Sequence, residues 1–262
     1  MRGSCSRKNC RFIHDKTICK DWFKGSCKRG DSCKWIHTNT SSESVKKPIL
    51  RKKKKNTETF EPSHKPLDLR ILVGSGQFYN KPIFNNDVII FPNFFNSGNT
   101  YNDLLNETKH EDFNRLWKLW HGDSHLIADD KIGWKKHCPT FNRIIGDIRD
   151  YFRMDIKATR FNWYRSTEEW KPYHHDAAAI DPKKSETQNF TVGISFGIER
   201  DIAFEHARTK TTVTIPLEDG CLYAFAKNVN IDWRHGIPQL PPTQYRNEGR
   251  ISIIAWGSVA ME

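Results

Sequence analysis

The sequence predicts a mainly β domain with supporting helices, of sandwich or jelly-roll type, preceded by a small module rich in cysteine and histidine. Three observations favour this fold class. Apolar residues alternate with small or polar ones over 190–198, which is the period of a strand with one apolar face. Helical periodicity occurs only before residue 155, and several short apolar runs follow it. Five of the seven cysteines lie between residues 5 and 33.

The expected helices precede the expected strands along the chain. Ile144, Ile148 and Phe152 recur every four residues, which places them on one face of a helix. With two shorter segments, the expected helices are 102–105, 113–120 and 141–152. Turn residues such as Asp219 and Gly220 separate the later apolar runs. Strands are expected at 190–198, 202–204, 211–215, 221–226 and 251–256.

Positive charge is concentrated in the N-terminal fifth of the chain. Residues 1–56 hold seventeen Lys or Arg and four Asp or Glu, a net charge of +13. The other 206 residues hold twenty-five and twenty-seven, a net charge of −2, and the two parts sum to +11. A basic arm beside a near-neutral body indicates an appendage that binds a polyanion such as nucleic acid.

Composition divides the chain into a cysteine- and histidine-rich module at 1–38, a linker at 39–66 and a folded domain at 67–262. The linker is polar and like-charged, so we expect it to be flexible. Its basic run at 51–55 could contact phosphates, act as a nuclear import signal or be solvated linker charge. Without an apolar run of eighteen residues or an apolar leader, we expect an intracellular protein with no membrane span. A monomer is the default expectation.

Four residues of the module have the spacing of a structural zinc site, C-x7-C-x5-C-x3-H: Cys19, Cys27, Cys33 and His37. Free thiols in a loop are a poor alternative, because no apolar core is present to house them. Disulfides are disfavoured by the expected intracellular location. An incomplete copy, Cys5, Cys10 and His14, precedes this set and could form a second zinc site, borrow a ligand or remain unstructured.

These two sets resemble tandem CCCH zinc fingers, and the shorter one is similar to the muscleblind type. The resemblance implies recognition of single-stranded RNA, in which aromatic rings stack on bases. Phe12, Phe23 and Trp35 are the candidates for stacking. For each of them, packing in the small core of the finger is the alternative.

The motif His-x-Asp at His174 and Asp176, followed by His235, carries the chemistry expected of the larger domain. Residues i and i+2 of a strand point to the same side, so His174 and Asp176 can converge on one ion while His175 faces outward. Two imidazoles and one carboxylate leave coordination positions open, which suits Fe(II) that must bind a cosubstrate and O₂. Alone the motif is weak, because it is common by chance and often structural.

The surroundings of the motif strengthen it. Arg250 and Ser252 stand at the start of an expected strand, where a guanidinium and a hydroxyl can grip a carboxylate. Asn162 and Tyr164 supply an amide and a phenol shortly before His174. In this order, over roughly residues 85–258, the fragments resemble the Fe(II)/2-oxoglutarate dioxygenase superfamily and, within it, most resemble the AlkB family.

The resemblance implies a double-stranded β-helix, a jelly roll, in which three catalytic side chains hold Fe(II): His174, Asp176 and His235. Four further side chains would bind 2-oxoglutarate, two at its distal carboxylate and two by other hydrogen bonds: Arg250, Ser252, Asn162 and Tyr164. The implied reaction uses O₂ and yields succinate, and oxidation of an N-methyl carbon would release formaldehyde.

Trp256 marks a departure from the AlkB pattern, which has a second arginine six residues after the first. Arg246 could substitute, but its offset of four residues along the chain does not ensure this. The departure bears on substrate range more than on iron or cosubstrate binding. Three aromatic residues near the expected mouth could sandwich a flipped base or pack in the core: Trp163, Trp170 and Tyr173.

We therefore expect an Fe(II)- and 2-oxoglutarate-dependent dioxygenase that oxidises nucleic acid, by N-demethylation, with single-stranded RNA delivered by the zinc finger. Two alternatives stay open, namely hydroxylation of a protein side chain and an RNA-binding protein with an inactive oxygenase fold. Glu205 and His206 could line the cavity, although a structural role is favoured. Cys138 and Cys221 are expected to be buried small hydrophobic residues.

Overall fold

The computed structural model describes residues 19, 21, 26–35, 37, 69–95, 98–121 and 124–262. The chain divides into two units, 1–63 and 64–262. The described residues of the first unit include a short 3-10 helix, η1 (Gly30–Ser32). The linker predicted at 39–66, with its basic run at 51–55, lies outside the described residues.

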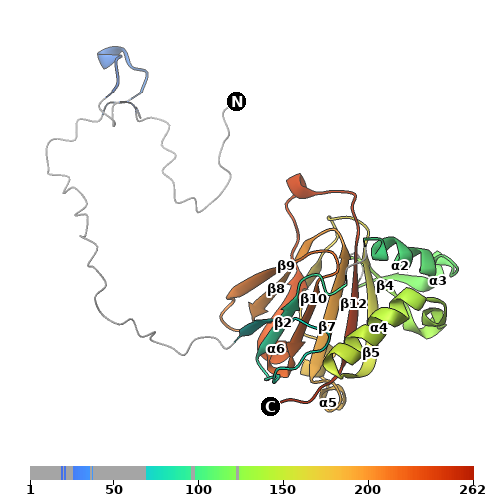
Figure 1. The fold of residues 1–262 in the computed structure, drawn as a ribbon. Coiled ribbons are helices and arrows are strands. Elements are labelled where there is room, and N and C mark those ends of the chain that lie inside the picture. Colours follow the sequence, from blue (N-terminus) through green and yellow to red (C-terminus); the bar gives the residue numbers. More distant parts are fainter. Residues whose placement is uncertain are drawn as a thin grey trace, which may run out of the picture. The chain divides into compact units, whose positions relative to one another are not determined.

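The second unit contains two β-sheets that pack face to face (Figure 1). The larger sheet has the strand order β1 (Arg70–Val73), β2 (Asp87–Phe91), β10 (Leu222–Ala226), β7 (Phe190–Gly197), β12 (Arg250–Ser258), β5 (Asp155–Tyr164), β4 (Leu126–Ala128) and β3 (Trp117–Leu119). The smaller sheet has the order β6 (Lys171–His174), β11 (Trp233–Ile237), β8 (Arg200–His206) and β9 (Thr212–Leu217). Facing sheets whose neighbouring strands are distant in sequence confirm the predicted jelly roll.

Helices cover the outer face of the larger sheet, and the longest of them is α4 (Pro139–Phe152) (Figure 1). Pro139 suits the first helical turn, where no N–H partner is needed, and the helix ends at Arg153, whose φ is 52°. Its apolar face, which includes Ile144 and Ile148, packs in one core with Ile253 of the sheet. The other helices are α2 (Thr100–Thr108), α3 (Phe113–Leu116), α5 (Pro182–Ser185), α6 (Lys227–Asp232), η2 (Asp130–Ile132), η3 (Trp134–His137), η4 (Ala177–Ala179) and η5 (Pro242–Gln244).

A second core fills the space between the two sheets. Phe204 of β8 meets Phe225 of β10 there, with ring centroids 5.6 Å apart. Along β12, side chains alternate between the two cores, so that Ile251 and Ile253 face the helices and Ile254 faces the smaller sheet. Part of this interior is polar instead of apolar, and the candidate site lies in that part.

The expected helices at 102–105 and 141–152 are confirmed by α2 and α4, and the five expected strands by β7, β8, β9, β10 and β12. The helix expected at 113–120 is wrong in its second half. It ends at Leu116, and Trp117 begins β3, whose backbone pairs with β4 while the buried indole packs on Phe161. Within the described ranges, none of the helices has the length and apolar character needed to cross a membrane.

Candidate active site

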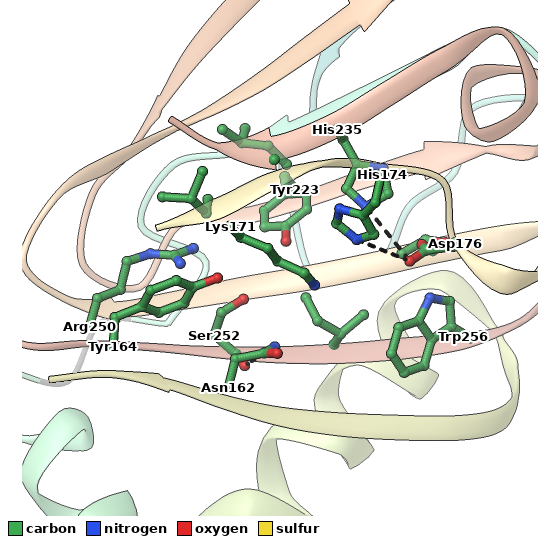
Figure 2. Close-up of a pocket in the computed structure, with 15 residues that line it drawn as sticks. Asn162, Tyr164, Lys171, His174, Asp176, Tyr223, His235, Arg250, Ser252 and Trp256 are labelled. Carbon is green, nitrogen blue, oxygen red and sulfur yellow. Dashed lines mark hydrogen bonds and ion pairs between the residues drawn. The ribbon is translucent and has the colours of Figure 1, made fainter. Parts of the chain in front are cut away.

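Two strands of the smaller sheet bring three ligand-type side chains together. β6 and β11 are antiparallel neighbours whose register pairs His174 with His235, and Asp176 follows β6 at i+2 from His174. Oδ1 of Asp176 lies 3.9 Å from Nε2 of His174 and 3.7 Å from Nε2 of His235 (Figure 2). One ligand atom from each of the three residues lies within 4.8 Å of the others, which is compatible with a single bound metal ion.

Both imidazoles of the triad are in the neutral form that metal binding requires. The backbone carbonyl of Pro172 lies 3.0 Å from Nδ1 of His174, and because a carbonyl only accepts, Nδ1 carries the proton and Nε2 presents its lone pair. Burial lowers the pKa of His174 well below its ordinary value. Burial also lowers the pKa of His235 to about 4, although the negative charge of Asp176 opposes this shift. Both rings are therefore neutral near pH 7, as metal ligands must be.

Asp176 is held in place by two residues that lie far away in the sequence. Its Oδ2 accepts a hydrogen bond from Oγ1 of Thr191 at 3.0 Å. The amide side chain of Asn230 accepts from the backbone N–H of Asp176 and donates to its carbonyl, at 2.8 and 3.3 Å. His175 turns away from the triad, with Nδ1 2.6 Å from the carbonyl of Asn230. These contacts leave Oδ1 of Asp176 directed at the two histidines.

Four polar side chains lie beyond the triad in the same interior. In the antiparallel pair of β5 and β12, Arg250 is opposite Tyr164 and Ser252 is opposite Asn162. With a period of two, all four side chains point into the space between the sheets (Figure 2). Together with the triad and Tyr223 they line what we term the inner cavity.

Arg250 places a buried positive charge in the lining of the inner cavity. The residue is 1% exposed, and Nε donates to Oγ of Ser195 at 2.7 Å. In the described part of the chain, its two terminal nitrogens have no hydrogen-bond partner. Arg200, another buried arginine, donates instead to the carbonyls of Thr167, Glu169 and Pro238. A buried cation with two free donors fits an anionic ligand, and a carboxylate matches its geometry.

An outer pocket of about 350 Å³ adjoins the inner cavity. Five residues line both spaces: Asn162, Lys171, His174, Asp176 and Trp256. The outer pocket is further lined by Trp120, Arg160 and Lys184. Lys171 lies between the triad and Arg250 (Figure 2). Its Nζ is 5.1 Å from the centre of the Trp120 ring. Burial lowers the pKa of Lys171 to about 8.

In the N-terminal unit, one ligand atom from each of four residues lies within 4.8 Å of the others: Cys19, Cys27, Cys33 and His37. Sγ of Cys33 lies 3.6 Å from Sγ of Cys19, and no disulfide bond links the cysteines of the described ranges. Three thiols and one imidazole at these distances suit a tetrahedral zinc ion. Trp35, two residues after the last cysteine, is 41% exposed. The shorter set, Cys5, Cys10 and His14, and the candidate stacking residues Phe12 and Phe23 lie outside the described residues.

Comparison with known families decides the class of the larger unit. Residues 90–255, more than half of the chain, match the model of the 2OG-Fe(II) oxygenase superfamily. The chain belongs to this superfamily. Residues 15–38 match the model of zinc fingers of the C-x8-C-x5-C-x3-H type and similar ones, and the first spacing of this finger is one residue shorter.

One solved structure similar to this oxygenase is described as the structure of OsALKBH1. It is 12% identical, the match covers 68% of this chain and 99% of that chain, and the TM-score is 0.48. No curated protein matches the oxygenase in sequence. The expected cofactors are confirmed, because a 2-oxoglutarate-dependent dioxygenase uses Fe(II), 2-oxoglutarate and O₂, and the CCCH finger holds zinc.

The structure bears on several alternatives that the sequence leaves open around the oxygenase site. Trp163 packs against Trp117 with ring centroids 5.2 Å apart and donates to the hydroxyl of Tyr101, so it lies in the core and not at the mouth. Trp170 and Tyr173 do not line either space. Trp163 therefore packs in the core. It stands between Asn162 and Tyr164 on β5, and because both of these face the cavity, Trp163 faces the opposite side of the strand.

Arg246 does not take the place of the second arginine. Its side chain is exposed and lies 3.9 Å from Glu248, whereas the indole of Trp256 lines both spaces (Figure 2). Glu205 pairs with Arg234 and Lys210, and His206 packs on Trp233, so the structural role favoured for these two residues is correct.

Cys138 and Cys221 are buried, as expected. Burial raises the pKa of their thiols to about 12 and about 11, which keeps both thiols protonated near neutral pH.

Four residues near the site are not indicated by any sequence motif: Trp120, His125, Lys171 and Tyr223. They come from β6, β10 and the segment before β4, and only the pairing of strands distant in sequence brings them together. Periodicity within β6 gives no signal for Lys171, because a spacing of three residues places Lys171 and His174 on opposite faces of a regular strand, and the register of β6 on β11 shifts between these two residues.

Proposed function

We propose that this oxygenase oxidises nucleic acid, with an N-methyl group on a base as the reacting carbon and single-stranded RNA as the preferred polymer. His174, Asp176 and His235 would hold Fe(II) through two imidazole nitrogens and one carboxylate oxygen. The free terminal nitrogens of Arg250 would pair with the distal carboxylate of 2-oxoglutarate, next to the hydroxyl of Ser252. Asn162 and Tyr164 would donate hydrogen bonds to the same molecule.

The bound iron and cosubstrate supply oxidation of a C–H bond by O₂, coupled to conversion of 2-oxoglutarate to succinate and CO₂. Hydroxylation of an N-methyl carbon gives an N-hydroxymethyl group, which releases formaldehyde and leaves the unmethylated nitrogen. The protein must exclude water and position the methyl carbon, and the burial of Asp176 and His235 serves the first of these needs.

The lining of the outer pocket is the observation that carries the choice of substrate. Two indoles, Trp120 and Trp256, line the pocket and can contact a planar group. Three cationic side chains, Arg160, Lys171 and Lys184, line the same space, and among its lining residues Asp176 is the one carboxylate. Iron would neutralise that carboxylate. Flat apolar faces with surplus positive charge suit a base that carries a phosphate backbone.

The zinc finger supports RNA as the polymer. The exposed indole of Trp35 could stack on an unpaired base, which is a frequent mode of recognition of single-stranded RNA. Tethering such a finger to the oxygenase raises the local concentration of the substrate. The basic run at 51–55 would add phosphate contacts, and we propose that it also serves in nuclear import.

The test is incubation of the full-length protein with Fe(II), 2-oxoglutarate and a panel of RNA and DNA oligonucleotides, each with one methylated base. We expect stoichiometric succinate and formaldehyde from at least one RNA, and a smaller yield from DNA of the same sequence. The matched control is His174→Ala, which removes one proposed iron ligand.

Two other outcomes would reject the proposal. Turnover of a peptide with no turnover of any oligonucleotide would identify a protein hydroxylase. Absence of succinate formation with every substrate, in wild type and in His174→Ala alike, would identify a binding protein with an inactive oxygenase fold.

A further inference from the structure

His125 lies behind the proposed cosubstrate residues and has no role in the function proposed above. It directly precedes β4, whose register places Leu126 opposite Trp163 of β5, and this pairing brings the imidazole next to Asn162 and Tyr164. The side chain is 0% exposed. Its ring is stacked on the Tyr164 ring, with centroids 4.4 Å apart and planes 11° apart. It is also stacked on Trp120 of the outer pocket, at 5.5 Å and 28°.

A series of hydrogen bonds decides which ring nitrogen of His125 carries the proton. The backbone oxygen of Ser252 can only accept, so the amide atom of Asn162 that lies 3.1 Å from it is the donor, Nδ2. The amide oxygen of Asn162 therefore faces Nε2 of His125, at 3.3 Å. An oxygen needs a donor at that position, so Nε2 carries the ring proton. Nδ1 then carries no proton, and the hydroxyl of Ser124, 3.1 Å away, has one proton to donate either to Nδ1 or to the backbone carbonyl of Trp120 at 3.0 Å, while the backbone of Trp170 is the remaining polar neighbour.

This arrangement has a consequence for the inner cavity. The amide nitrogen of Asn162 has two N–H groups, and the carbonyl of Ser252 uses one of them. Asn162 lines the cavity, so the second N–H is available to an acceptor there. With the amide turned over, its oxygen would face the carbonyl of Ser252 and repel it. The donor at Nε2 of His125 favours the orientation that presents an N–H to an anionic cosubstrate.

We propose that His125 is a positioning residue of the cosubstrate site, which holds the amide of Asn162 with an N–H toward the cavity and fixes the plane of the Tyr164 ring. This rests on the role proposed above for Asn162 and Tyr164 in binding 2-oxoglutarate. Burial lowers the pKa of His125 to about 3, so the neutral form that the role requires persists at all physiological pH values.

Calorimetric titration of 2-oxoglutarate into the full-length protein, loaded with Mn(II) in place of iron, tests the proposal without turnover. His125→Phe keeps a ring between Tyr164 and Trp120 and removes the donor, and we expect it to weaken 2-oxoglutarate binding by about tenfold. Mn(II) affinity should stay close to wild type. His125→Gln supplies an amide donor, and we expect it to restore binding to within about threefold of wild type.

A double-mutant cycle separates positioning from a general structural role. Asn162→Ala should remove the partner through which His125 acts, so adding His125→Phe to it should weaken binding by less than about twofold further. Wild-type affinity in His125→Phe, or the same tenfold loss in the Asn162→Ala background, would overturn the proposal.

A second measurement uses the wild-type protein, so it does not depend on whether a variant folds. In ¹⁵N-histidine-labelled protein, the resonances of His125 should show the tautomer with the proton on Nε2 at pH 7 and still at pH 5. A proton on Nδ1, or a cationic ring at pH 5, would overturn the proposal. Neither experiment uses nucleic acid. A nucleic-acid panel that fails while both experiments succeed would therefore reject the proposed substrate and leave the role of His125 standing.

Discussion

The guanidinium of Arg250 lies 5.2 Å from the centre of the Tyr164 ring, and the two residues are directly opposite each other in the register of β12 and β5. The cation therefore has an aromatic face on one side and keeps two donors free toward the cavity. Burial raises the pKa of Tyr164, although the positive charge of Arg250 opposes this shift, so the phenol remains a donor. Two adjacent strands thus place a cation and a hydroxyl together in the lining of the inner cavity.

Replacing Arg250 should weaken cosubstrate binding with little effect on stability, whereas replacing Arg200 should destabilise the fold. Arg250→Met removes a charge whose terminal nitrogens have no partner in the described residues, so the free energy of unfolding of the cosubstrate-free protein should change by less than about 1 kcal/mol. Binding of 2-oxoglutarate should fall by about a hundredfold or more. Arg200→Met leaves three carbonyls without their donor and should lower the free energy of unfolding by about 3 kcal/mol. Urea unfolding and calorimetry measure both quantities, and equal destabilisation by the two substitutions would contradict the role assigned to Arg250.

The metal-free protein should lose stability as the pH falls from 6.5 toward 4. Burial lowers the pKa of His235 to about 4 and that of His125 to about 3, whereas the unfolded chain protonates near 6.5. Unfolding therefore takes up protons in this window, and each histidine should cost on the order of 3 kcal/mol by its lower end. Urea unfolding at several pH values in chelator measures the slope. His125→Phe should reduce that slope, and an unchanged slope would contradict the assignment of a neutral buried His125.

Reversing a charge at the outer pocket should change the KM for an oligonucleotide substrate and leave the KM for 2-oxoglutarate unchanged. Lys184 lines the pocket, whereas Lys183, its exposed neighbour on α5, does not. Lys184→Glu should raise the KM for an oligonucleotide substrate by about fivefold at low salt, with a smaller effect at high salt. The KM for 2-oxoglutarate should be unchanged. Lys183→Glu is the matched control, and equal effects of the two reversals would indicate long-range charge instead of a contact at the mouth.

The exposed indole of Trp35 should contribute to RNA binding and should not affect succinate formation. Trp35→Ala should weaken the affinity for single-stranded RNA by about tenfold, because base stacking on an aromatic ring is worth on the order of 1–3 kcal/mol. Succinate formation without RNA should stay at the wild-type rate. Fluorescence anisotropy and a succinate assay measure the two effects, and loss of both together would mean that the finger and the oxygenase do not act as separate modules.

Local patterns in the sequence are enough to predict the strands with alternating residues and the spacing of the triad. His174 and Asp176 are two apart, so they share a side of the chain whatever strand pairing follows. The same alternation along β5 places Trp163 on the opposite face from Asn162 and Tyr164. Strand periodicity alone is therefore sufficient to exclude Trp163 from the cavity that Asn162 and Tyr164 line.

Other parts of the site depend on pairing between distant strands. His125 meets Tyr164 only because β4 pairs with β5, and Trp117 leaves its expected helix because β3 pairs with β4. Such pairings are set by the whole fold and not by local propensity. The resemblance to the AlkB family predicts a second arginine at the position of Trp256, but the consequence of the tryptophan, an indole in the wall of both spaces, depends on how the strands pack.

We propose that one metal centre and one buried arginine serve oxidation of a methylated base. Mass spectrometry of nucleosides from total RNA and DNA, before and after incubation with the protein, Fe(II) and 2-oxoglutarate, tests it most directly. We expect one methylated ribonucleoside to decrease with an equal rise of its unmethylated form, and no change with His174→Ala. An unchanged nucleoside profile, in a reaction where succinate still accumulates, would contradict the claim.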